Sequence, residues 1–159
     1  MKRYEADVLK LGEQLRARGA MLATAESCTG GLIAAVCTSV AGSSDWFERG
    51  FVTYSNAAKT EMLGVDATLI AAHGAVSAEV VRAMAEGALR HSSAHLAIAV
   101  TGVAGPSGGT PAKPVGTVWF ALAQRGAAAE AELLQLGGDR TAVREQTLAF
   151  ALQRLLARS

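Results

Sequence analysis

The segment HLAIAVTG (95–102) constrains the fold of this chain more than any other. Its apolar residues are continuous, whereas a strand with one face in water alternates apolar and polar residues. A strand of this kind must be covered on both faces, as in the parallel sheets of α/β proteins. The short segment AMLATA (20–25) likewise predicts a buried strand.

The other elements follow from periodicity and from cap residues. Apolar residues recur at three- and four-residue spacing, and Ser77 and Asp139 are suited to cap helices. The predicted helices span 4–18, 30–40, 56–63, 66–72, 78–91 and 139–157. Further strands are predicted over 49–55, 116–124 and 128–136, the last two forming a hairpin through Arg125–Gly126.

Helices and strands alternate at first, and a hairpin and a final helix follow. This order predicts an α/β fold, a three-layer α/β/α sandwich on a mixed sheet. The length of 159 residues suits a single domain, 1–159, with one sizeable core.

The composition excludes several classes of protein. Half of the residues are hydrophobic and 18% are charged, which is typical of a globular chain. A formal net charge of +1 and 5% aromatic residues argue against a dedicated nucleic-acid binder. No apolar run approaches the ~18 residues that span a bilayer, and the charged N-terminus has no apolar signal core. We therefore expect a soluble cytoplasmic protein without a membrane partner.

The cysteines and histidines predict neither a disulfide nor a metal site. Cys28 and Cys37, if both lie on the helix over 30–40, are roughly 13 Å apart and too distant to pair. His73, His91 and His95 are not joined by cysteines or carboxylates at ligand spacing. We expect no metal and no cofactor.

The loop over 101–116 stands out in composition. It holds all three prolines of the chain and five of its 17 glycines. It follows a buried strand, and ligands of open α/β sheets bind beyond the carboxyl ends of strands. It matches neither a Walker A loop nor a dinucleotide fingerprint, and a long structural connection is the alternative.

The segment ATAESCTGG (23–31) predicts a strand, a tight turn and a helix start. Ser27 on such a turn can act as a nucleophile, and the backbone N–H groups that follow can bind an oxyanion. Alternatively, Ser27 or Thr29 merely caps the helix. Cys28 is a rival nucleophile.

A serine nucleophile needs a base. None of the three histidines is well placed, because His73 lies between helices and the other two precede a strand. Lys59 follows the strand over 49–55, and a desolvated lysine can accept the proton of a serine. Tyr54 can relay or steer that proton. Lys59 can also be a solvated helix residue, and Lys113 can contact an anion.

The segment GGDR opens the final helix and supplies a second cationic group. Arg140 and Arg144 are four residues apart and share a helix face. They can hold a phosphate. Solvation of that face is the alternative, and it is favoured for Arg144.

Long segments of the chain resemble the nicotinamide-nucleotide amidohydrolase family, also called the CinA C-terminal domain family. The resemblance covers about residues 5–155. It rests on TAESCTGG, GSSDWFERGFVTYSNAAKTEMLGV, HGAVSAEVVRAMAEGAL, AVTGVAGPSGGTPAKPVGTVWFALA and GDRTAVREQ, in this order.

The resemblance implies hydrolysis of nicotinamide mononucleotide to nicotinate mononucleotide and ammonia, by a metal-independent Ser–Lys mechanism in bacterial pyridine-nucleotide recycling. Ser27 matches the nucleophile, Lys59 the general base and Tyr54 an assisting tyrosine. The residues expected to bind the substrate are Thr29, Gly30, Gly31, Thr101, Gly102, Gly105 and Arg140.

Three further expectations concern the whole protein. The resemblance implies a stand-alone domain and a homo-oligomer. The alternative function is a nucleotide- or partner-binding module that uses the same pocket without catalysis.

Overall fold

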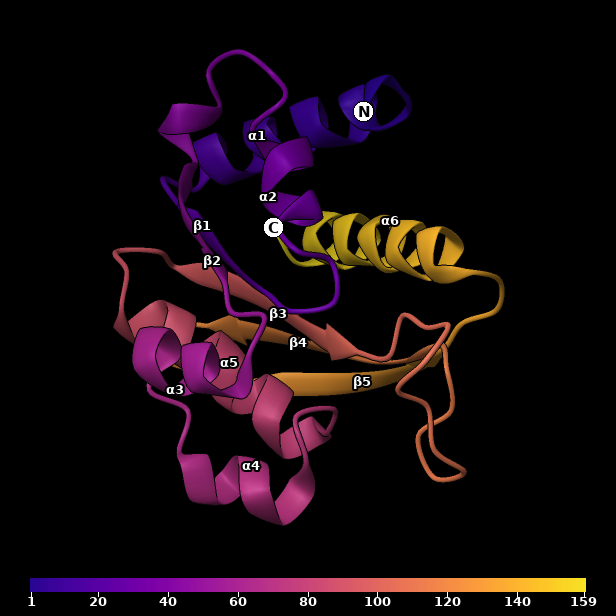
Figure 1. The fold of residues 1–159 in the computed structure, drawn as a ribbon. Helices are drawn as coiled ribbons and strands as arrows, with labels where there is room; N and C mark the ends of the chain where they lie inside the picture. The colour runs from indigo at the N-terminus through magenta and orange to yellow at the C-terminus, as the bar shows by residue number, and fades with distance from the viewer.

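The protein is described by a computed structural model that covers residues 1–159. Its helices and strands alternate along the chain (Figure 1). The strands are β1 (Leu22–Glu26), β2 (Phe47–Val52), β3 (Leu96–Gly102), β4 (Thr117–Gln124) and β5 (Glu130–Gln135). The α-helices are α1 (Glu5–Ala17), α2 (Leu32–Cys37), α3 (Asn56–Leu63), α4 (Ala67–His73), α5 (Ala78–Arg90) and α6 (Arg140–Arg158). Short 3-10 helices span Lys2–Tyr4 and Ser43–Asp45.

The five strands form one mixed sheet in the order β2-β1-β3-β4-β5. β1 pairs in parallel with both β2 and β3, whereas β4 and β5 are antiparallel to their neighbours. The carboxyl ends of β1, β2 and β3 therefore meet at one edge of the sheet, as the sequence predicts for a ligand site.

The two faces of the sheet carry side chains of different size. Large residues such as Leu22 and Ile98 pack against α1, α2 and α6 in one core cluster. Alanines such as Ala23 and Ala99 pack against α3, α4 and α5 in a second cluster. Small side chains let α5 lie close to the sheet, and helices cover both faces (Figure 1). The predicted three-layer α/β/α sandwich on a mixed sheet is confirmed.

Most predicted elements are present, and two predictions at their boundaries are wrong. The helix predicted over 30–40 is shorter, because two left-handed glycines precede Leu32. The strand predicted over 49–55 begins at Phe47 and ends at Val52, where its pairing with β1 ends. Cys28 lies in the turn before α2, as the segment over 23–31 predicts, and Cys28 and Cys37 are buried and free.

None of the helices is both long enough and apolar enough to span a lipid bilayer.

Candidate active site

A pocket of about 200 Å³ opens at the edge of the sheet where β1 and β3 end. The segment after β2 and the start of α6 complete its wall. It is lined by Ser27, Cys28, Tyr54, Asn56, Lys59, Ala75, Val76, Thr101, Gly102, Ala104 and Arg140.

Ser27 is the first residue after β1 and begins a tight turn. Its amide donates a hydrogen bond to the carbonyl of Val100 (3.1 Å), which ties it to β3. Its carbonyl accepts from the amide of Gly30 (3.0 Å). Gly30 and Gly31 have φ of 59° and 100°, in the left-handed region that favours glycine. The nucleophile predicted from the sequence thus lies on a strand–turn–helix connection.

Lys59 reaches Ser27 from α3. The hydroxyl of Ser55 caps this helix by accepting from the amide of Ala58 (3.0 Å), so Lys59 lies one turn inside it. Its side chain extends through the core and is only 1% exposed. The Lys59 Nζ lies 3.1 Å from the Ser27 Oγ. The structure therefore brings the two residues together.

The other partners of the Lys59 amine are two backbone carbonyls. Its Nζ donates to the carbonyls of Thr53 (3.1 Å) and Tyr54 (3.3 Å), and no carboxylate pairs with it. Burial lowers the pKa of Lys59 from its usual 10.5, because an ammonium loses its hydration there.

Two protonation states of Lys59 satisfy this set of partners. An ammonium donates its three N–H groups to the Ser27 Oγ and the two carbonyls. A neutral amine donates to the two carbonyls only, and its lone pair is then left for the hydroxyl proton of Ser27. The arrangement can remove a proton from Ser27, as a general base must.

Tyr54 contacts the Ser27–Lys59 pair through its main chain. Its carbonyl accepts from Lys59 and lies 3.5 Å from the Ser27 Oγ. Its side chain is 61% exposed, and its hydroxyl accepts from the Arg140 Nη2 at 3.1 Å. The phenol thus has no hydrogen bond with Lys59 or Ser27, although Tyr54 lines the pocket.

Arg140 lies across the rim of the pocket. Its Nη1 donates to the carbonyl of Gly105 (2.9 Å), in the loop that follows β3. The side chain of Asp139 caps α6 by accepting from the amide of Ala142 (2.9 Å), so Arg140 begins the helix. Arg140 thereby joins three segments around one opening: the residues after β2, the loop after β3 and α6.

Of the residues expected to bind the substrate, Thr101 and Gly102 line the pocket together with Arg140. The Thr101 hydroxyl donates to the carbonyl of Ala75 (2.9 Å) and joins β3 to the segment before α5. Gly105 does not line the pocket, but its carbonyl accepts a hydrogen bond from Arg140.

Thr29, Gly30 and Gly31 do not line the pocket. The Thr29 side chain is fully buried, and its hydroxyl donates to a carboxylate oxygen of Glu26 (2.7 Å). The two glycines shape the turn instead. The structure therefore turns Thr29 away from the cavity and gives it a role inside the turn.

Sequence reasoning missed several residues of the site. Asn56, Ala75, Val76 and Ala104 line the pocket but carry no pattern of their own. Glu26 did carry a signal, because a carboxylate inside a buried strand needs hydrogen-bond partners. Arg144, for which solvation was favoured, donates to the carbonyl of Thr29 (3.1 Å).

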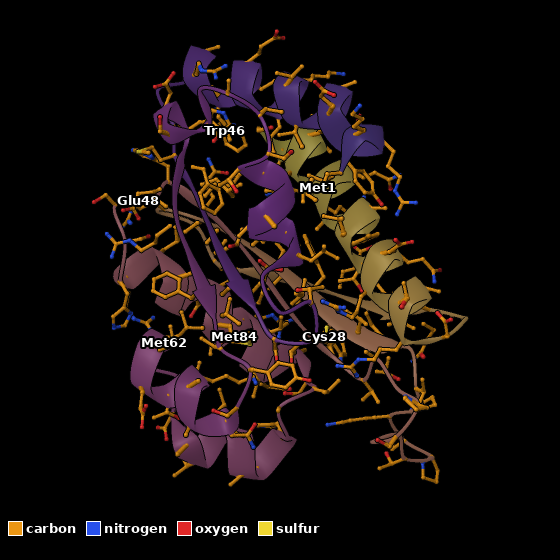
Figure 2. The ribbon with its side chains drawn as sticks, turned by 45° about the horizontal axis from the view of Figure 1, so that its top comes forward. Met1, Cys28, Trp46, Glu48, Met62 and Met84 are labelled. Carbon is orange, nitrogen blue, oxygen red and sulfur yellow. The ribbon has the colours of Figure 1, made fainter.

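Cys28 lines the pocket beside Ser27, in the turn between β1 and α2 (Figure 2). Burial is the main cause that raises the pKa of its thiol to about 11. At pH 7 only about one molecule in 10⁴ would then carry the thiolate, which is the reactive form. This disfavours the rival nucleophile.

The remaining candidate residues lie outside the pocket. His91 contacts the carbonyl of Gly87 (2.8 Å), and His95 accepts from the amide of Met21 (3.0 Å). The Lys113 amine donates to the carbonyl of His73 (2.8 Å). None of them lies beside Ser27 in the pocket.

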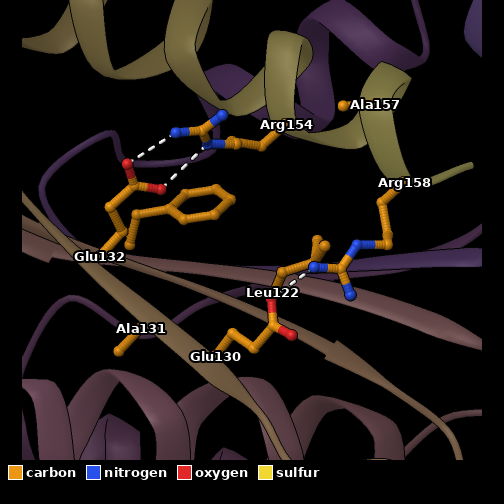
Figure 3. Close-up of a pocket in the computed structure, with 8 residues that line it drawn as sticks. Leu122, Glu130, Ala131, Glu132, Arg154, Ala157 and Arg158 are labelled. Atoms are coloured by element: carbon orange, nitrogen blue, oxygen red, sulfur yellow. Dashed lines mark hydrogen bonds and ion pairs between the residues drawn. The ribbon is translucent and has the colours of Figure 1, made fainter.

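A second cavity, of about 300 Å³, lies between α6 and the outer strands β4 and β5 (Figure 3). Arg154 pairs there with Glu132 through two hydrogen bonds, and Arg158 pairs with Glu130. Its lining has no serine, cysteine, lysine or histidine. Its charges are paired, and it offers no nucleophile or base.

Comparison with known proteins identifies the family of this chain. Residues 5–158 match the model of the CinA C-terminal domain. The nicotinamide-nucleotide amidohydrolase PncC of Escherichia coli is 55% identical over 92% of this chain and 88% of its own length. The protein of the same name from Pseudomonas putida is 58% identical over 92% of this chain and 91% of its own.

A solved structure agrees as well. The crystal structure of a competence-damaged protein (CinA) superfamily protein from Escherichia coli superposes with a TM-score of 0.92. The two chains are 35% identical, over 96% of this chain and 88% of that one. This chain belongs to the CinA C-terminal domain family.

Proposed function

We propose that this chain is an amidohydrolase that converts nicotinamide mononucleotide to nicotinate mononucleotide and ammonia, in pyridine-nucleotide recycling. The names of the relatives with 55% and 58% identity support the substrate class. The observation that carries the chemistry is the 3.1 Å distance between the Ser27 Oγ and the Lys59 Nζ inside a pocket.

In the first step, Ser27 attacks the carboxamide carbon. Neutral Lys59 takes the hydroxyl proton while the bond between Oγ and carbon forms. The positive charge of the pyridinium ring makes this carbon more electrophilic. The carbonyl oxygen of the substrate becomes an oxyanion.

We assign the oxyanion contact to the turn after Ser27. The amide of Cys28, a residue that lines the pocket, donates no hydrogen bond to another group of the protein. By contrast, the amides of Ile33 and Ala34 are occupied by Glu26. An oxyanion contact of this kind stabilises the transition state by about 3 kcal/mol.

The second half of the reaction reverses the proton transfer. Protonated Lys59 gives its proton to the amide nitrogen, the C–N bond breaks and ammonia leaves. Water then attacks the Ser27 ester and gives a proton to Lys59, which returns it to the Ser27 oxygen. The carboxyl group that forms loses its remaining proton to solvent, and the product is the nicotinate carboxylate.

Arg140 is the group that we assign to the phosphate of the nucleotide. Its guanidinium is at the rim of the pocket, and its present acceptors are a carbonyl and a phenol, both uncharged. A phosphate is a stronger acceptor than either. Thr101 and Gly102 line the same pocket, and we assign them to the ring.

The test is ammonia release from four substrates: nicotinamide mononucleotide, nicotinamide, the riboside and the dinucleotide. We expect the mononucleotide to give the highest kcat/KM. Release from none of them, with binding of the mononucleotide retained, would instead support a binding module. Action in the cytoplasm as a homo-oligomer stays a prediction.

A further inference from the structure

The residue before the nucleophile is a carboxylate buried inside the protein. Glu26 ends β1 and is only 1% exposed, and no lysine, arginine or histidine pairs with it. Its Oε1 accepts from the Thr29 hydroxyl (2.7 Å) and from the amide of Ile33 (2.8 Å). Its Oε2 accepts from the amide of Ala34 (3.0 Å). A buried carboxylate is costly unless hydrogen bonds of this kind compensate for the lost water.

In most helices, the side chain of the N-cap residue accepts hydrogen bonds from the first backbone amides. In α2, Glu26 accepts these bonds instead. The N-cap of α2 is Gly31, which has no side chain to accept from the first amides of the helix. Glu26 does so from the preceding strand, five residues upstream. Its hydrogen bonds therefore join the last residue of β1 to the first turn of α2, across the turn that carries Ser27.

The turn over 27–31 is thus fixed at several points. Glu26 binds the Thr29 hydroxyl, and Arg144 donates to the Thr29 carbonyl from α6 (3.1 Å). The backbone of Ser27 is bonded to β3. Glu26 itself does not line the pocket, so it has no direct access to the substrate.

We propose that Glu26 is the positioning residue of the nucleophile: its three hydrogen bonds fix the turn that sets the Ser27 Oγ against the Lys59 Nζ. The same bonds occupy the Ile33 and Ala34 amides and leave that of Cys28 for the oxyanion. This assignment rests on the proposed function, because it concerns the same reaction.

The first test is Glu26→Gln, which keeps the size of the side chain. One of its two positions becomes an NH₂ group that faces a donor, so at least one hydrogen bond is lost. We expect kcat for nicotinamide mononucleotide to fall about 100-fold, since small misplacements of reacting groups have effects of this order. KM should stay within about twofold, because no group that lines the pocket has changed.

The matched control is Asp66→Ala. Asp66 caps α4 by accepting from the amide of Thr68 (2.9 Å) and is exposed outside the pocket. This variant loses a helix cap and therefore stability, as Glu26→Gln does. Its kcat should equal that of the wild type. If both variants lose kcat in proportion to stability, Glu26 has a structural role only.

Thr29 supplies a second, milder test. Thr29→Val removes the hydroxyl at constant shape, and Thr29→Ser keeps it. We expect kcat to fall about 10-fold in the first and to be retained in the second. Equal kcat in the two variants, or wild-type kcat in folded Glu26→Gln, would overturn the proposal. If Glu26→Gln does not fold, the comparison of Thr29→Val with Thr29→Ser tests the positioning role.

Labelling of Ser27 by a fluorophosphonate separates this proposal from the proposed function. If the wild type releases no ammonia from any pyridine nucleotide, the proposed function fails, yet the labelling rate still reports how Ser27 is placed. We expect Glu26→Gln to be labelled about 10-fold more slowly than the wild type and Asp66→Ala at the wild-type rate. Equal rates in all three proteins would contradict a positioning role.

Discussion

The Lys59 amine and the Ser27 hydroxyl are 3.1 Å apart, although 32 residues separate them in the sequence. The parallel pairing of β1 and β2 creates this contact, because Ser27 directly follows β1 and Lys59 lies on α3, the helix that follows β2. When the amine is neutral, its two N–H groups bond to two carbonyls and its lone pair is free for the serine proton.

Replacement Lys59→Met removes the base at nearly constant length. We expect kcat/KM to fall about 10³-fold, within the range for loss of general-base catalysis. Ammonia release under kcat/KM conditions measures this effect. A decrease in kcat/KM of less than tenfold would mean that another group accepts the proton.

The same variant tests the cost of burying the amine. Because burial lowers the pKa of Lys59 in the folded state, the unfolded chain binds more protons between the folded pKa and 10.5. Wild-type stability relative to Lys59→Met should therefore rise as the pH passes through the folded pKa toward 10.5. Urea unfolding of both proteins over a pH series measures this. A relative stability that falls over this interval would contradict a lowered pKa.

The pH dependence of catalysis reports the same group. Only neutral Lys59 can accept the serine proton, so kcat/KM should rise with pH through a single ionisation below 10.5. This limb should be absent from the residual activity of Lys59→Met. An unchanged limb in that variant would assign the ionisation elsewhere.

Replacement Cys28→Ala should leave kcat within about threefold of the wild type. Its thiol, with a pKa of about 11, is protonated at neutral pH and makes no contact that the mechanism uses. Steady-state kinetics of this variant and of Ser27→Ala compare the two nucleophiles. Inactive, folded Cys28→Ala would reverse the assignment.

Replacement Tyr54→Phe separates the phenol from the main chain. The carbonyl that accepts from Lys59 remains, so kcat should change by less than about tenfold. The hydrogen bond from Arg140 to the Tyr54 hydroxyl is lost in this variant.

Replacement Arg140→Ala tests the contact with the phosphate. It should raise KM for the mononucleotide more than KM for the riboside. An equal rise in KM for both substrates would mean that Arg140 does not bind the phosphate.

Much of the fold follows from the sequence because the core strands have unambiguous patterns. The apolar run of β3 and the hairpin of β4 and β5 specify a mixed sheet with covered faces. The boundaries of β2 and α2 do not follow, because they depend on pairing with β1 and on the left-handed glycines.

The site could be predicted only in part, and the family resemblance carried much of that prediction. The sequence predicts Ser27, Lys59 and Arg140, and the structure brings them to one pocket. The roles of Tyr54 and Thr29 differ in detail, because main-chain contacts and the direction of a buried hydroxyl leave no pattern in a sequence. Glu26 carries no signal beyond a carboxylate inside a buried strand, because its partners are mostly backbone amides.

The most direct test of the account is the identity of the acylated residue. Cys28→Ala, quenched with acid during turnover of nicotinamide mononucleotide, is digested and its peptides are weighed by mass spectrometry. We predict a nicotinate mononucleotide ester on Ser27 that disappears when Ser27 is also replaced by Ala. Undiminished ammonia release by Ser27→Ala, or an ester on another residue, would contradict the central claim that Ser27 is the nucleophile.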